Sequence, residues 1–326
     1  MSNTAIKMST VIAVIVAYYP DLQLLRQQLS SILEQYNQVV IIDNTPGGNN
    51  FSADYSKDFS SISTIHLGQN FGIAYAQNIG IQAAIDAGAD FVLLMDQDSI
   101  PEDNMVPKLL SVFQEEDNSN VIAAGPSYVD PRTNVRSYFM MSKFGLPSRY
   151  KPDTKVNLLS TVQAAFLISS GTLISIPKLL KIGGMRSNYF IDHVDTEWCL
   201  RARDKGYFLI GVHSASMEHS LGDKVKRVWL FYLRSVAHHP PLRDYYMFRN
   251  TILMLRDVKM PFLWQCFNLF RLFPFAIYFL LFTKNRITRA SAMLLGLKHG
   301  FASIDGMINL EKGTCTPIPK TSLDPA

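Results

Sequence analysis

The sequence predicts an α/β protein built on a mostly parallel central sheet with helices on both faces. Three observations lead to this prediction: short apolar runs recur along the first half of the chain, helical patterns separate them, and 48% of the 326 residues are hydrophobic. Such runs are typical of buried parallel strands, and their alternation with helices is typical of βαβ units. The length suits one large domain, or one domain with an appendage.

Strands and helices alternate through the first half. Apolar runs predict strands at residues 11–16, 39–42, 62–66, 91–95 and 121–124. Between them, apolar residues at helical spacing predict helices over residues 21–35, 71–87 and 101–116. Gly88 is suited to end the second helix, and Pro101 to begin the third. Parallel strands joined by such helices form a sheet that is covered on both faces.

The pattern changes in the second half. Residues 130–159 are irregular and rich in proline, serine and basic residues, which predicts a mobile loop that sets specificity. Further elements are a return to sheet at 162–175, a helix at 196–205 and a strand at 207–212. From about Val228 onward the chain is helical, aromatic and basic.

Charge separates the two halves as well. Residues 224–298 hold thirteen lysines and arginines against two acids, a local charge of +11, whereas the whole chain carries +4. Such a stretch is either a solvated helical face or a surface that attracts anionic lipid or a phosphate-bearing substrate. We therefore predict a domain over 1–225, an amphipathic basic helical region over 226–312 and a loose tail over 313–326.

The cysteines and the N-terminus bear on the compartment. Cys199, Cys266 and Cys315 are far apart and lack CxxC spacing. They predict neither a zinc site nor a disulfide framework, which fits a reducing environment. The N-terminus has no apolar signal region followed by a cleavage site, and residues 11–16 are better interpreted as a core strand.

The apolar segment 260–282 has three interpretations. It is interrupted by Gln265, Asn268, Arg271 and Pro274, and its uninterrupted part is shorter than the roughly 20 residues that a membrane span needs. An amphipathic helix lying in the membrane interface is favoured, because the first three polar residues share a helix face and basic residues flank the segment. A buried helix packed on the domain and a true span are the alternatives.

The clearest local signal is Asp96-Gln97-Asp98, which follows the apolar strand at 91–95. Ligands of open α/β sheets bind at the carboxyl ends of parallel strands. Two acids buried there are costly without a partner, and a divalent cation that bridges to a diphosphate removes the conflict. Asp98 is the acid expected to contact the metal ion, and capping of the following helix by Asp98 and Ser99 is the alternative.

Other polar residues lie at the same sheet edge. Asp43 follows the strand at 39–42, where it can accept hydrogen bonds from a base or a ribose, or cap the turn before Pro46. Two further motifs bracket the start of the next helix, Asn70-Phe71-Gly72 and Asn78-Ile79-Gly80. Asparagine and glycine allow a ligand to approach the backbone closely, although helix packing on the sheet explains Gly80 equally well.

A second acidic cluster lies within residues 190–201. Asp192, Asp195 and Glu197 stand just before a predicted helix. Three acids exceed what capping requires, and one of them can act as general base on a hydroxyl group. In the structural alternative, Asp195 is only the N-cap, and Glu197 pairs with Arg201 one turn later.

Together these stretches resemble the family 2 glycosyltransferases, and within them the bacterial rhamnosyltransferase-like group. The resemblance covers roughly residues 10–256, and its motifs occur in order, which makes them far more specific than any one alone. The matching segments are Ala17-Tyr18-Tyr19-Pro20-Asp21, Ile42-Asp43-Asn44, Asn70-Phe71-Gly72-Ile73-Ala74, Gln77-Asn78-Ile79-Gly80, Leu93-Leu94-Met95-Asp96-Gln97-Asp98-Ser99, Ser169-Ser170-Gly171, Phe190-Ile191-Asp192 through Arg201, Met217-Glu218-His219-Ser220 and Tyr245-Tyr246-Met247-Phe248-Arg249-Asn250.

The resemblance implies a GT-A fold and a nucleotide-diphosphate sugar donor. It implies that the donor nucleotide is bound by residues among Ala17, Tyr18, Asp43, Asn70, Asn78, Asp96 and Gln97. Asp96 and Asp98 would hold the metal ion and the diphosphate, and His219 would complete the metal site. An imidazole ligand suits Mn²⁺ better than Mg²⁺. A surface loop histidine is the alternative for His219.

The family's base position falls on Asp195, and its second acid on Glu197. In the common form of this motif an acid directly precedes the base. Here that position is Val194, which leaves Asp192 as a rival for the base. The implied reaction is a single inverting displacement, in which the base deprotonates an acceptor hydroxyl and no covalent intermediate forms.

The rhamnosyltransferase-like group suggests dTDP-L-rhamnose as donor. It suggests as acceptor a lipid-linked saccharide of O antigen or another surface polysaccharide. Such acceptors lie on the cytoplasmic face of the bacterial inner membrane, so the basic C-terminal region is expected to bind that surface peripherally. No nucleic-acid partner is expected.

Three rival interpretations remain. The donor can instead be UDP-galactofuranose or a UDP-hexose. A sugar-nucleotide nucleotidyltransferase also combines an α/β sheet with a metal carboxylate, but it usually has a glycine-rich basic phosphate loop where this chain has Ala17-Tyr18-Tyr19-Pro20. A membrane-bound scaffold without activity leaves the acids at 96, 98, 192 and 195 unexplained.

Overall fold

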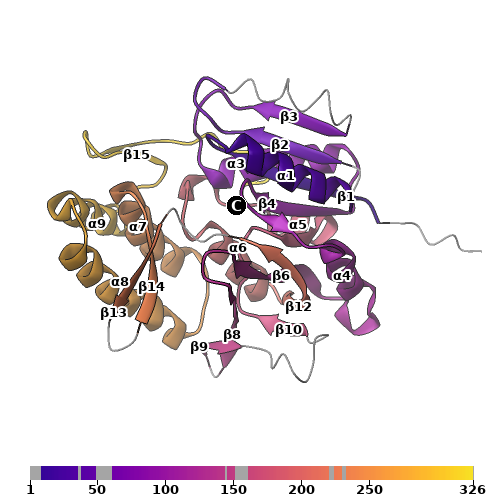
Figure 1. The fold of residues 1–326 in the computed structure, drawn as a ribbon. Coiled ribbons are helices and arrows are strands. Elements are labelled where there is room, and N and C mark those ends of the chain that lie inside the picture. The colour runs from indigo at the N-terminus through magenta and orange to yellow at the C-terminus, as the bar shows by residue number, and fades with distance from the viewer. Residues whose placement is uncertain are drawn as a thin grey trace, which may run out of the picture.

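The computed structural model describes residues 9–35, 38–48, 61–143, 145–150, 161–219, 224–229 and 233–325. A central sheet holds most of the strands, in the order β10-β12-β6-β11-β4-β1-β2-β3 (Figure 1). These strands, in chain order, are β1 (Val11–Ala17), β2 (Val39–Asp43), β3 (Ile62–His66), β4 (Phe91–Asp96), β6 (Val121–Asp130), β10 (Thr161–Ala164), β11 (Thr172–Ser175) and β12 (Phe208–Glu218).

The sheet is mostly parallel. Strands β3, β2, β1 and β4 run parallel, and β6 runs parallel to β12. Strand β11 lies antiparallel between β4 and β6, and β10 lies antiparallel to β12 at the edge. The predicted α/β class is confirmed.

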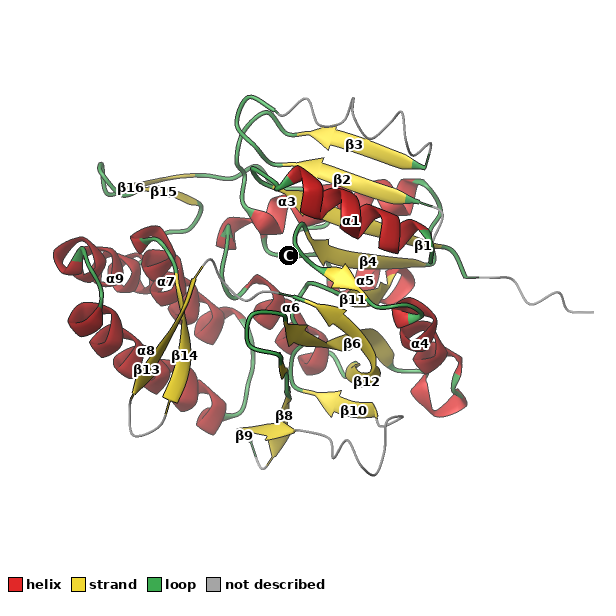
Figure 2. Cartoon of the chain, in the orientation of Figure 1, coloured by secondary structure: helices red, strands yellow, loops and turns green. Residues whose placement is uncertain are grey.

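Helices cover both faces of the sheet (Figure 2). On one face, α1 (Leu22–Leu33) and α4 (Met105–Ser111) contribute Leu25, Leu29 and Leu109 to an apolar core. On the other, a second core includes α3 (Ile73–Asp86), α5 (Ile176–Ile182) and α6 (Val194–Asp204). This arrangement follows from the strands, which are buried on both sides.

Gly80 is explained by the packing of α3. A Cβ atom on Gly80 would lie 2.2 Å from Cγ1 of Val14 in β1, so no larger residue fits between helix and sheet. The structure therefore supports the packing interpretation of this glycine over a ligand contact.

The predicted helix at 101–116 is partly wrong. Ile100–Pro101 forms a short strand, β5, that pairs with β12, and α4 begins only at Met105. It gives way to two 3₁₀ turns, Val112–Gln114 and Glu116–Asn118. Pairing with a distant strand overrides the local helical pattern, because Asn104 at the N-cap adopts a left-handed conformation that separates the two elements.

The stretch 130–159 is less irregular than predicted. It contains β7 (Val135–Arg136), which extends the sheet beside β6, and an antiparallel pair, β8 (Phe139–Lys143) and β9 (Leu146–Tyr150). Residues 151–159 of the predicted loop lie outside the described residues.

The C-terminal region begins with a hairpin rather than a helix. Strands β13 (Lys224–Trp229) and β14 (Leu233–His238) pair antiparallel. Three helices follow and lie to one side of the sheet, α7 (Pro241–Asp257), α8 (Phe262–Phe282) and α9 (Arg286–Phe301) (Figure 1). A small hairpin, β15 (Met307–Asn309) with β16 (Thr314–Thr316), comes next.

The tail, predicted to be loose, is packed against the first domain. Leu323 is buried in the core with α3 and α5, and its carbonyl accepts a hydrogen bond from the Gly184 amide. The Asp324 carboxylate accepts hydrogen bonds from the amide and the hydroxyl of Ser187, both at 2.8 Å. An acid and an apolar residue within a polar tail give too little pattern for a sequence to reveal this contact.

Helix α8 buries Trp264, Leu272 and Phe279 together with polar side chains, and exposes a row of large apolar residues on its other face. Asn268 is buried and Arg271 reaches the first domain, whereas Phe270 and Phe273 are 75% and 70% exposed. Among the described residues, α8 is the one helix long and apolar enough to cross a membrane, and 22% of its apolar window is buried. This polarity is opposite to that of a helix on the surface of a water-soluble domain.

Candidate active site

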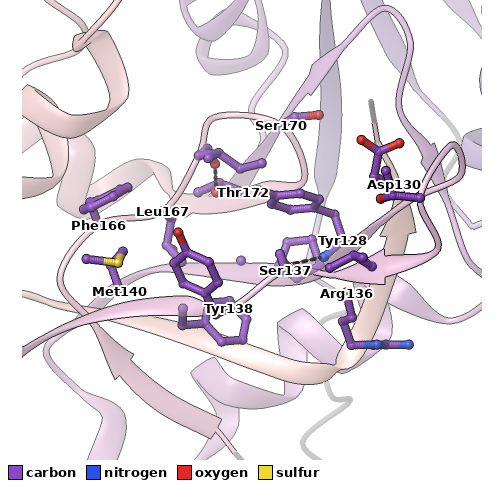
Figure 3. A pocket seen from close by; sticks show the side chains of 16 residues that line it. Tyr128, Asp130, Arg136, Ser137, Tyr138, Met140, Phe166, Leu167, Ser170 and Thr172 are labelled. Carbon is purple, nitrogen blue, oxygen red and sulfur yellow. Dashed lines mark hydrogen bonds between the residues drawn. The ribbon is translucent and has the colours of Figure 1, made fainter. Parts of the chain in front are cut away.

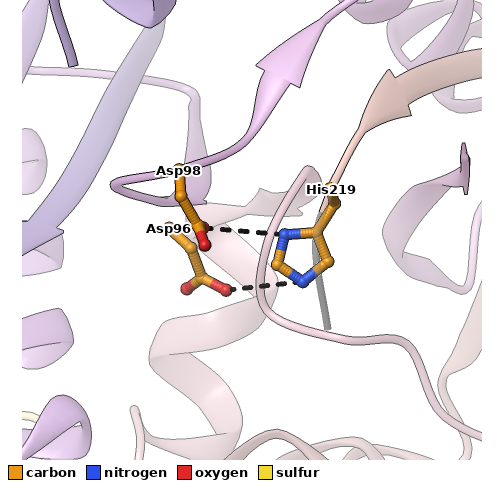
Figure 4. Close-up of side chains that lie close together, drawn as sticks. All are labelled: Asp96, Asp98 and His219. Atoms are coloured by element: carbon orange, nitrogen blue, oxygen red, sulfur yellow. Dashed lines mark ion pairs between the residues drawn. The ribbon is translucent and has the colours of Figure 1, made fainter. Parts of the chain in front are cut away.

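Asp96, Asp98 and His219 meet at the carboxyl end of β4. One potential ligand atom from each lies within 4.8 Å of the others. Figure 4 shows both carboxylates facing the imidazole ring, with Oδ2 of Asp96 4.0 Å from Nε2 and Oδ1 of Asp98 3.7 Å from Nδ1. The structure thus brings together all three residues that the sequence predicted for a metal site.

Strand pairing brings His219 to this place. Strand β5 pairs antiparallel with the end of β12, in the register Glu218 to Ile100. The next residue on each side is therefore His219 and Ser99, and the Ser99 hydroxyl lies 2.7 Å from Nδ1 of His219. The edge of the Tyr128 ring packs against the same imidazole, with ring centroids 5.5 Å apart.

A second serine ties this group to β4. The Ser170 hydroxyl donates to the Ser99 hydroxyl at 2.7 Å and accepts from the Asp96 amide at 3.1 Å. Where the imidazole proton is on Nδ1, it points to Ser99, and the Nε2 lone pair faces Asp96. Such outer hydrogen bonds fix the ring orientation of metal-binding histidines.

The electrostatics favour a cation between the two acids. Removal from water, together with the Asp98 and Asp195 carboxylates, raises the pKa of Asp96 to about 6, while His219 and Arg243 lower it. A carboxyl group crowded by like charges gains from a positive ion. Two carboxylates and an imidazole are a suitable donor set for Mn²⁺ or Mg²⁺, with His219 favouring Mn²⁺.

The loop before α6 has an unusual backbone. Phe190, Asp192 and His193 all have positive φ angles, of 66°, 65° and 61°. Such conformations cost energy in residues other than glycine and persist only where the surroundings hold them. We call this segment, residues 190–193, the strained loop.

Two residues of α7 hold the strained loop. The Asn250 amide donates to the carbonyls of Tyr189, Ile191 and Asp192, at 2.8–2.9 Å. The buried Arg249 guanidinium donates to the carbonyls of Asn188, Tyr189 and Gly306. Across the loop, the Phe190 carbonyl accepts from the Ile73 amide at 2.7 Å, and a Cβ on Gly72 would lie 2.5 Å from the Phe190 oxygen.

The structure separates the two candidates for the base. Asp192 forms a bidentate ion pair with Arg243, with contacts of 2.5 and 3.2 Å, and its side chain is 4% exposed. Asp195, in the first turn of α6, is partly exposed and has no basic partner among the described residues. Burial raises its pKa, whereas hydrogen bonds from Thr196 and the Ser169 amide lower it.

Glu197 lies in the protein interior. It is fully buried, and its carboxylate accepts from Arg186 at 2.8 Å and from Arg201 at 2.8 and 3.0 Å. Arg201 also donates to the carbonyls of Ile182 and Gly184. The pairing of Glu197 with Arg201, the structural alternative, is therefore present, and Glu197 has no exposed surface at which to meet a substrate.

Beside the two acids, Gln97 forms hydrogen bonds to the loop after β1. Its side chain accepts from the Tyr18 amide at 2.6 Å and donates to the Tyr18 carbonyl at 3.1 Å. The rings of Tyr18 and Tyr19 are exposed and meet edge to face at 4.8 Å. Ala17 is buried at the end of β1, and its carbonyl accepts from the Asn44 amide.

Asp43 has no exposed surface. It accepts from the Thr45 amide at 3.0 Å, and its other oxygen lies 2.9 Å from Nδ1 of His66. The exposed group at this point is the His66 ring, which the sequence did not single out. Of the two side chains, only His66 is exposed enough to contact a ligand at this edge of the sheet.

The two asparagines hold the chain itself. Asn70 accepts from the Gly72 amide and from Asn44, which in turn accepts from the Phe71 amide. Asn78 is fully buried and bonds both the amide and the carbonyl of Met185 at 2.7 Å. The structure therefore does not bring Asn78 to a ligand surface.

Three arginines near the acids were missed as site residues. Arg243 pairs with Asp192, Arg249 braces the strained loop, and Arg271 lies 3.1 Å from His193. The motif at 245–250 was recognised, but a helical pattern does not reveal which loop its side chains hold. A polar residue inside an apolar helix was the available signal for Arg271.

The comparisons with known proteins agree with this geometry. Residues 13–175 match the model of the family described as glycosyl transferase family 2. The dTDP-rhamnosyl transferase RfbF of Shigella flexneri is 31% identical over 313 residues, which are 94% of this chain and 98% of that protein.

A solved structure, GalNAc-T7 with UDP, GalNAc and Mn²⁺, superposes on 66% of this chain with a TM-score of 0.54 and 13% identity. The chain spans 44% of the length of that protein, and the likeness concerns the fold. Its α/β fold is the GT-A fold that the sequence predicted. With a GT-A sheet, a family match over half its length and a full-length relative above 30% identity, the chain belongs to glycosyl transferase family 2.

Proposed function

We propose that this glycosyltransferase is metal-dependent and inverting, and that it transfers L-rhamnose from dTDP-L-rhamnose to a lipid-linked saccharide during synthesis of O antigen or another surface polysaccharide. The observation that carries the proposal is that two adjacent serines connect the candidate base to the metal-site acids. Ser169 donates its amide to Asp195, and the adjacent Ser170 bonds the Asp96 amide, so that the partly exposed acid and the metal-site acids share one wall.

The chain's own groups account for the chemical step. Asp195 takes the proton from an acceptor hydroxyl as its oxygen forms a bond to the anomeric carbon of the donor. The bond from that carbon to the diphosphate oxygen breaks on the opposite face, which inverts the configuration. Because Asp192 forms an ion pair with Arg243, we assign the role of base to Asp195.

Asp96, Asp98 and His219 would hold the divalent cation, and the imidazole favours Mn²⁺ over Mg²⁺. Such an ion, when bound, neutralises the charge of the leaving diphosphate. The hydroxyls of Ser99 and Ser170 orient His219 and Asp96 for this role.

The donor assignment is supported by the Shigella relative, whose name specifies dTDP-rhamnose. UDP-galactofuranose and a UDP-hexose are the alternatives within the family. The exposed rings of Tyr18, Tyr19 and His66 offer the nucleotide a surface at the ends of β1 to β3. Membership of a glycosyltransferase family removes the support for a nucleotidyltransferase.

The outward apolar face of α8 supports a peripheral site on the inner membrane. Phe262, Phe270 and Phe273 are each at least 70% exposed, and full removal of such a side chain from water contributes about 1.5–3 kcal/mol. Exposed Lys259, Lys284 and Arg286 flank the helix and are suited to anionic lipid headgroups. Docking there would bring the cleft close to a lipid-linked acceptor.

The test is a screen of purified protein for thermal stabilisation. dTDP-L-rhamnose, UDP-galactofuranose and UDP-glucose are each added with Mn²⁺, with Mg²⁺ and with EDTA. We expect the largest rise in Tm with dTDP-L-rhamnose and Mn²⁺, and release of dTDP when membrane lipids from an O-antigen-producing strain are added. If a UDP-sugar stabilised the protein and dTDP-L-rhamnose did not, the proposed donor would be wrong. Equal stabilisation in EDTA would contradict the metal dependence.

A further inference from the structure

A cavity of about 440 Å³ lies beside the metal site, and most of its lining residues have no role in the preceding assignments. Its walls come from the end of β6, from β7 and β8, and from residues 166–172 before and at the start of β11. Figure 3 shows the side chains of Tyr128, Tyr138, Met140 and Phe166 around this space, with Ser170 at one edge. We call it the β6–β8 pocket.

The sheet order separates this pocket from the nucleotide surface. Strands β1, β2 and β3, which carry Tyr18 and Asp43 at their ends, lie on one side of β4 and its Asp96. Strand β6 lies on the other side, beyond β11. The pocket therefore lies on the other side of β4 from a nucleotide bound at the ends of β1 to β3.

The pocket shares its wall with both reacting groups. Ile168 and Ser170 line the pocket, and the residue between them, Ser169, donates its amide to the Asp195 carboxylate. Ser170 also bonds the Asp96 amide, and Tyr128 packs against His219. An occupant of this pocket therefore touches residues that contact the metal ligands, and lies beside the serine whose amide bonds the candidate base.

The lining suits a sugar ring. Tyr128, Tyr138 and Phe166 supply aromatic surface, which the C–H face of a pyranose can cover. Neither the Tyr128 nor the Tyr138 hydroxyl has a hydrogen-bond partner among the described residues, so both can donate to sugar oxygens. Mostly apolar pockets with a few placed polar groups are typical of small-molecule sites.

We propose that the β6–β8 pocket binds the sugar residue of the acceptor that carries the attacking hydroxyl. This inference rests on the proposed function, because it requires Asp195 to be the base. The wall shared with Asp195 favours the acceptor over the donor, since the base must contact the acceptor hydroxyl. A pyranose ring bound there presents a hydroxyl at Ser169–Ser170, between Asp195 and the metal site.

The first test uses ligand-observed NMR on the whole protein with dTDP and Mg²⁺. The probes are methyl glycosides of hexoses, 6-deoxyhexoses and N-acetylhexosamines. We expect saturation transfer to at least one of them, reduced at least fivefold in Tyr138→Ala and in Phe166→Ala. Tyr138→Phe, which keeps the ring, should retain part of the signal. Phe208→Ala, an exposed aromatic at the opposite end of β12, is the matched control.

The second test separates acceptor from donor. In Tyr138→Ala, the Kd for dTDP-L-rhamnose and the slow hydrolysis of this donor by water should stay within twofold of wild type. A parallel loss of donor affinity or hydrolysis would show that the pocket holds the donor sugar and would overturn the proposal. No saturation transfer to any glycoside in wild type would overturn it as well. Failure of the proposed function is distinguished by a wild type that neither binds nor hydrolyses the donor.

Discussion

Nη2 of Arg271, on α8, lies 3.1 Å from Nε2 of His193, in the strained loop that precedes Asp195. Burial and the Arg271 charge hold the pKa of His193 well below its usual range, so the ring is neutral and accepts this hydrogen bond. The same helix presents Phe270 and Phe273 outward. Helix α8 therefore connects the apolar surface to the loop that positions the candidate base.

Removing the Arg271 side chain should slow transfer without weakening donor binding. Arg271→Ala removes the guanidinium beside His193 and so takes away one of the contacts that hold the strained loop, while those of Arg249 and Asn250 remain. We expect kcat to fall about tenfold, which corresponds to about 1.4 kcal/mol of misplacement at the base. The rate of dTDP release and the Kd for dTDP-L-rhamnose are the measurements. Lys312→Ala, an exposed cation on the β15–β16 turn, is the control, and an equal loss there would contradict this role.

Asp195 and Asp192 should respond differently to the same amide substitution. Asp195→Asn removes the base, so transfer should fall by about 10²–10⁴-fold while donor affinity stays near wild type. Asp192→Asn instead leaves Arg243 without its carboxylate, so a lower Tm should accompany any loss of rate. Single-turnover rates and thermal unfolding distinguish the two. If Asp195→Asn transferred the sugar at a near-normal rate, another residue would have to be the base.

The hydroxyl of Ser99 should tune metal affinity without binding the metal itself. Ser99→Ala removes the partner of His219 Nδ1, and loss of such an outer hydrogen bond typically lowers metal affinity by about 10–100-fold. Mn²⁺ titration monitored by water-proton relaxation measures the effect. Ser111→Ala, at the end of α4, provides a matched control. An unchanged Mn²⁺ affinity in Ser99→Ala would argue against His219 as a ligand.

Activity should be lost on the acid side at a higher pH than an ordinary aspartate would give. A carboxylate acts as a base only when it is ionised. Because burial raises the pKa of Asp195 above its usual value, Asp195 becomes protonated and inactive at a higher pH than an ordinary aspartate. Rates at saturating Mn²⁺ should decline about tenfold per unit below the apparent pKa, and a flat profile down to about pH 5 in a folded sample would contradict the base assignment. Protonation of Asp96, whose pKa is about 6 without a bound cation, competes with cation binding, so the Mn²⁺ concentration for half activity should rise as the pH falls.

The outward face of α8 should govern membrane binding. Phe270→Ser with Phe273→Ser removes two exposed aromatic side chains but leaves the inward contacts of α8 in place. We expect binding to phosphatidylglycerol-containing liposomes to fall at least tenfold, as the burial of two such rings contributes well over 1.4 kcal/mol. Sedimentation with liposomes at low and high salt measures this. Phe208→Ala serves as the control, and unchanged sedimentation of the double variant would exclude this face.

Local pattern determined the fold class and much of the site. Apolar runs ending in Asp43 and Asp96 were enough to place both acids at one sheet edge, because parallel strands end on the same side. Motif order added His219 and Asp195. Hydrophobic periodicity shows which residues of a helix or strand face the interior, but it does so for one element at a time.

Tertiary contacts decided the roles of the individual acids. Glu197, Asp192 and Asp195 lie within six residues, yet Glu197 is buried between Arg186 and Arg201, Asp192 is paired with Arg243, and Asp195 is partly exposed. Spacing predicted the pair with Arg201, one turn later on the same helix. Arg186 and Arg243 come from other elements, and no spacing within the cluster reveals them. The orientation of α8 is similar, since its sequence contains both faces. The burial of Asn268, whose amide bonds the Trp264 carbonyl within α8, and the contact of Arg271 with His193 decided which face points outward, because buried polar groups must find partners.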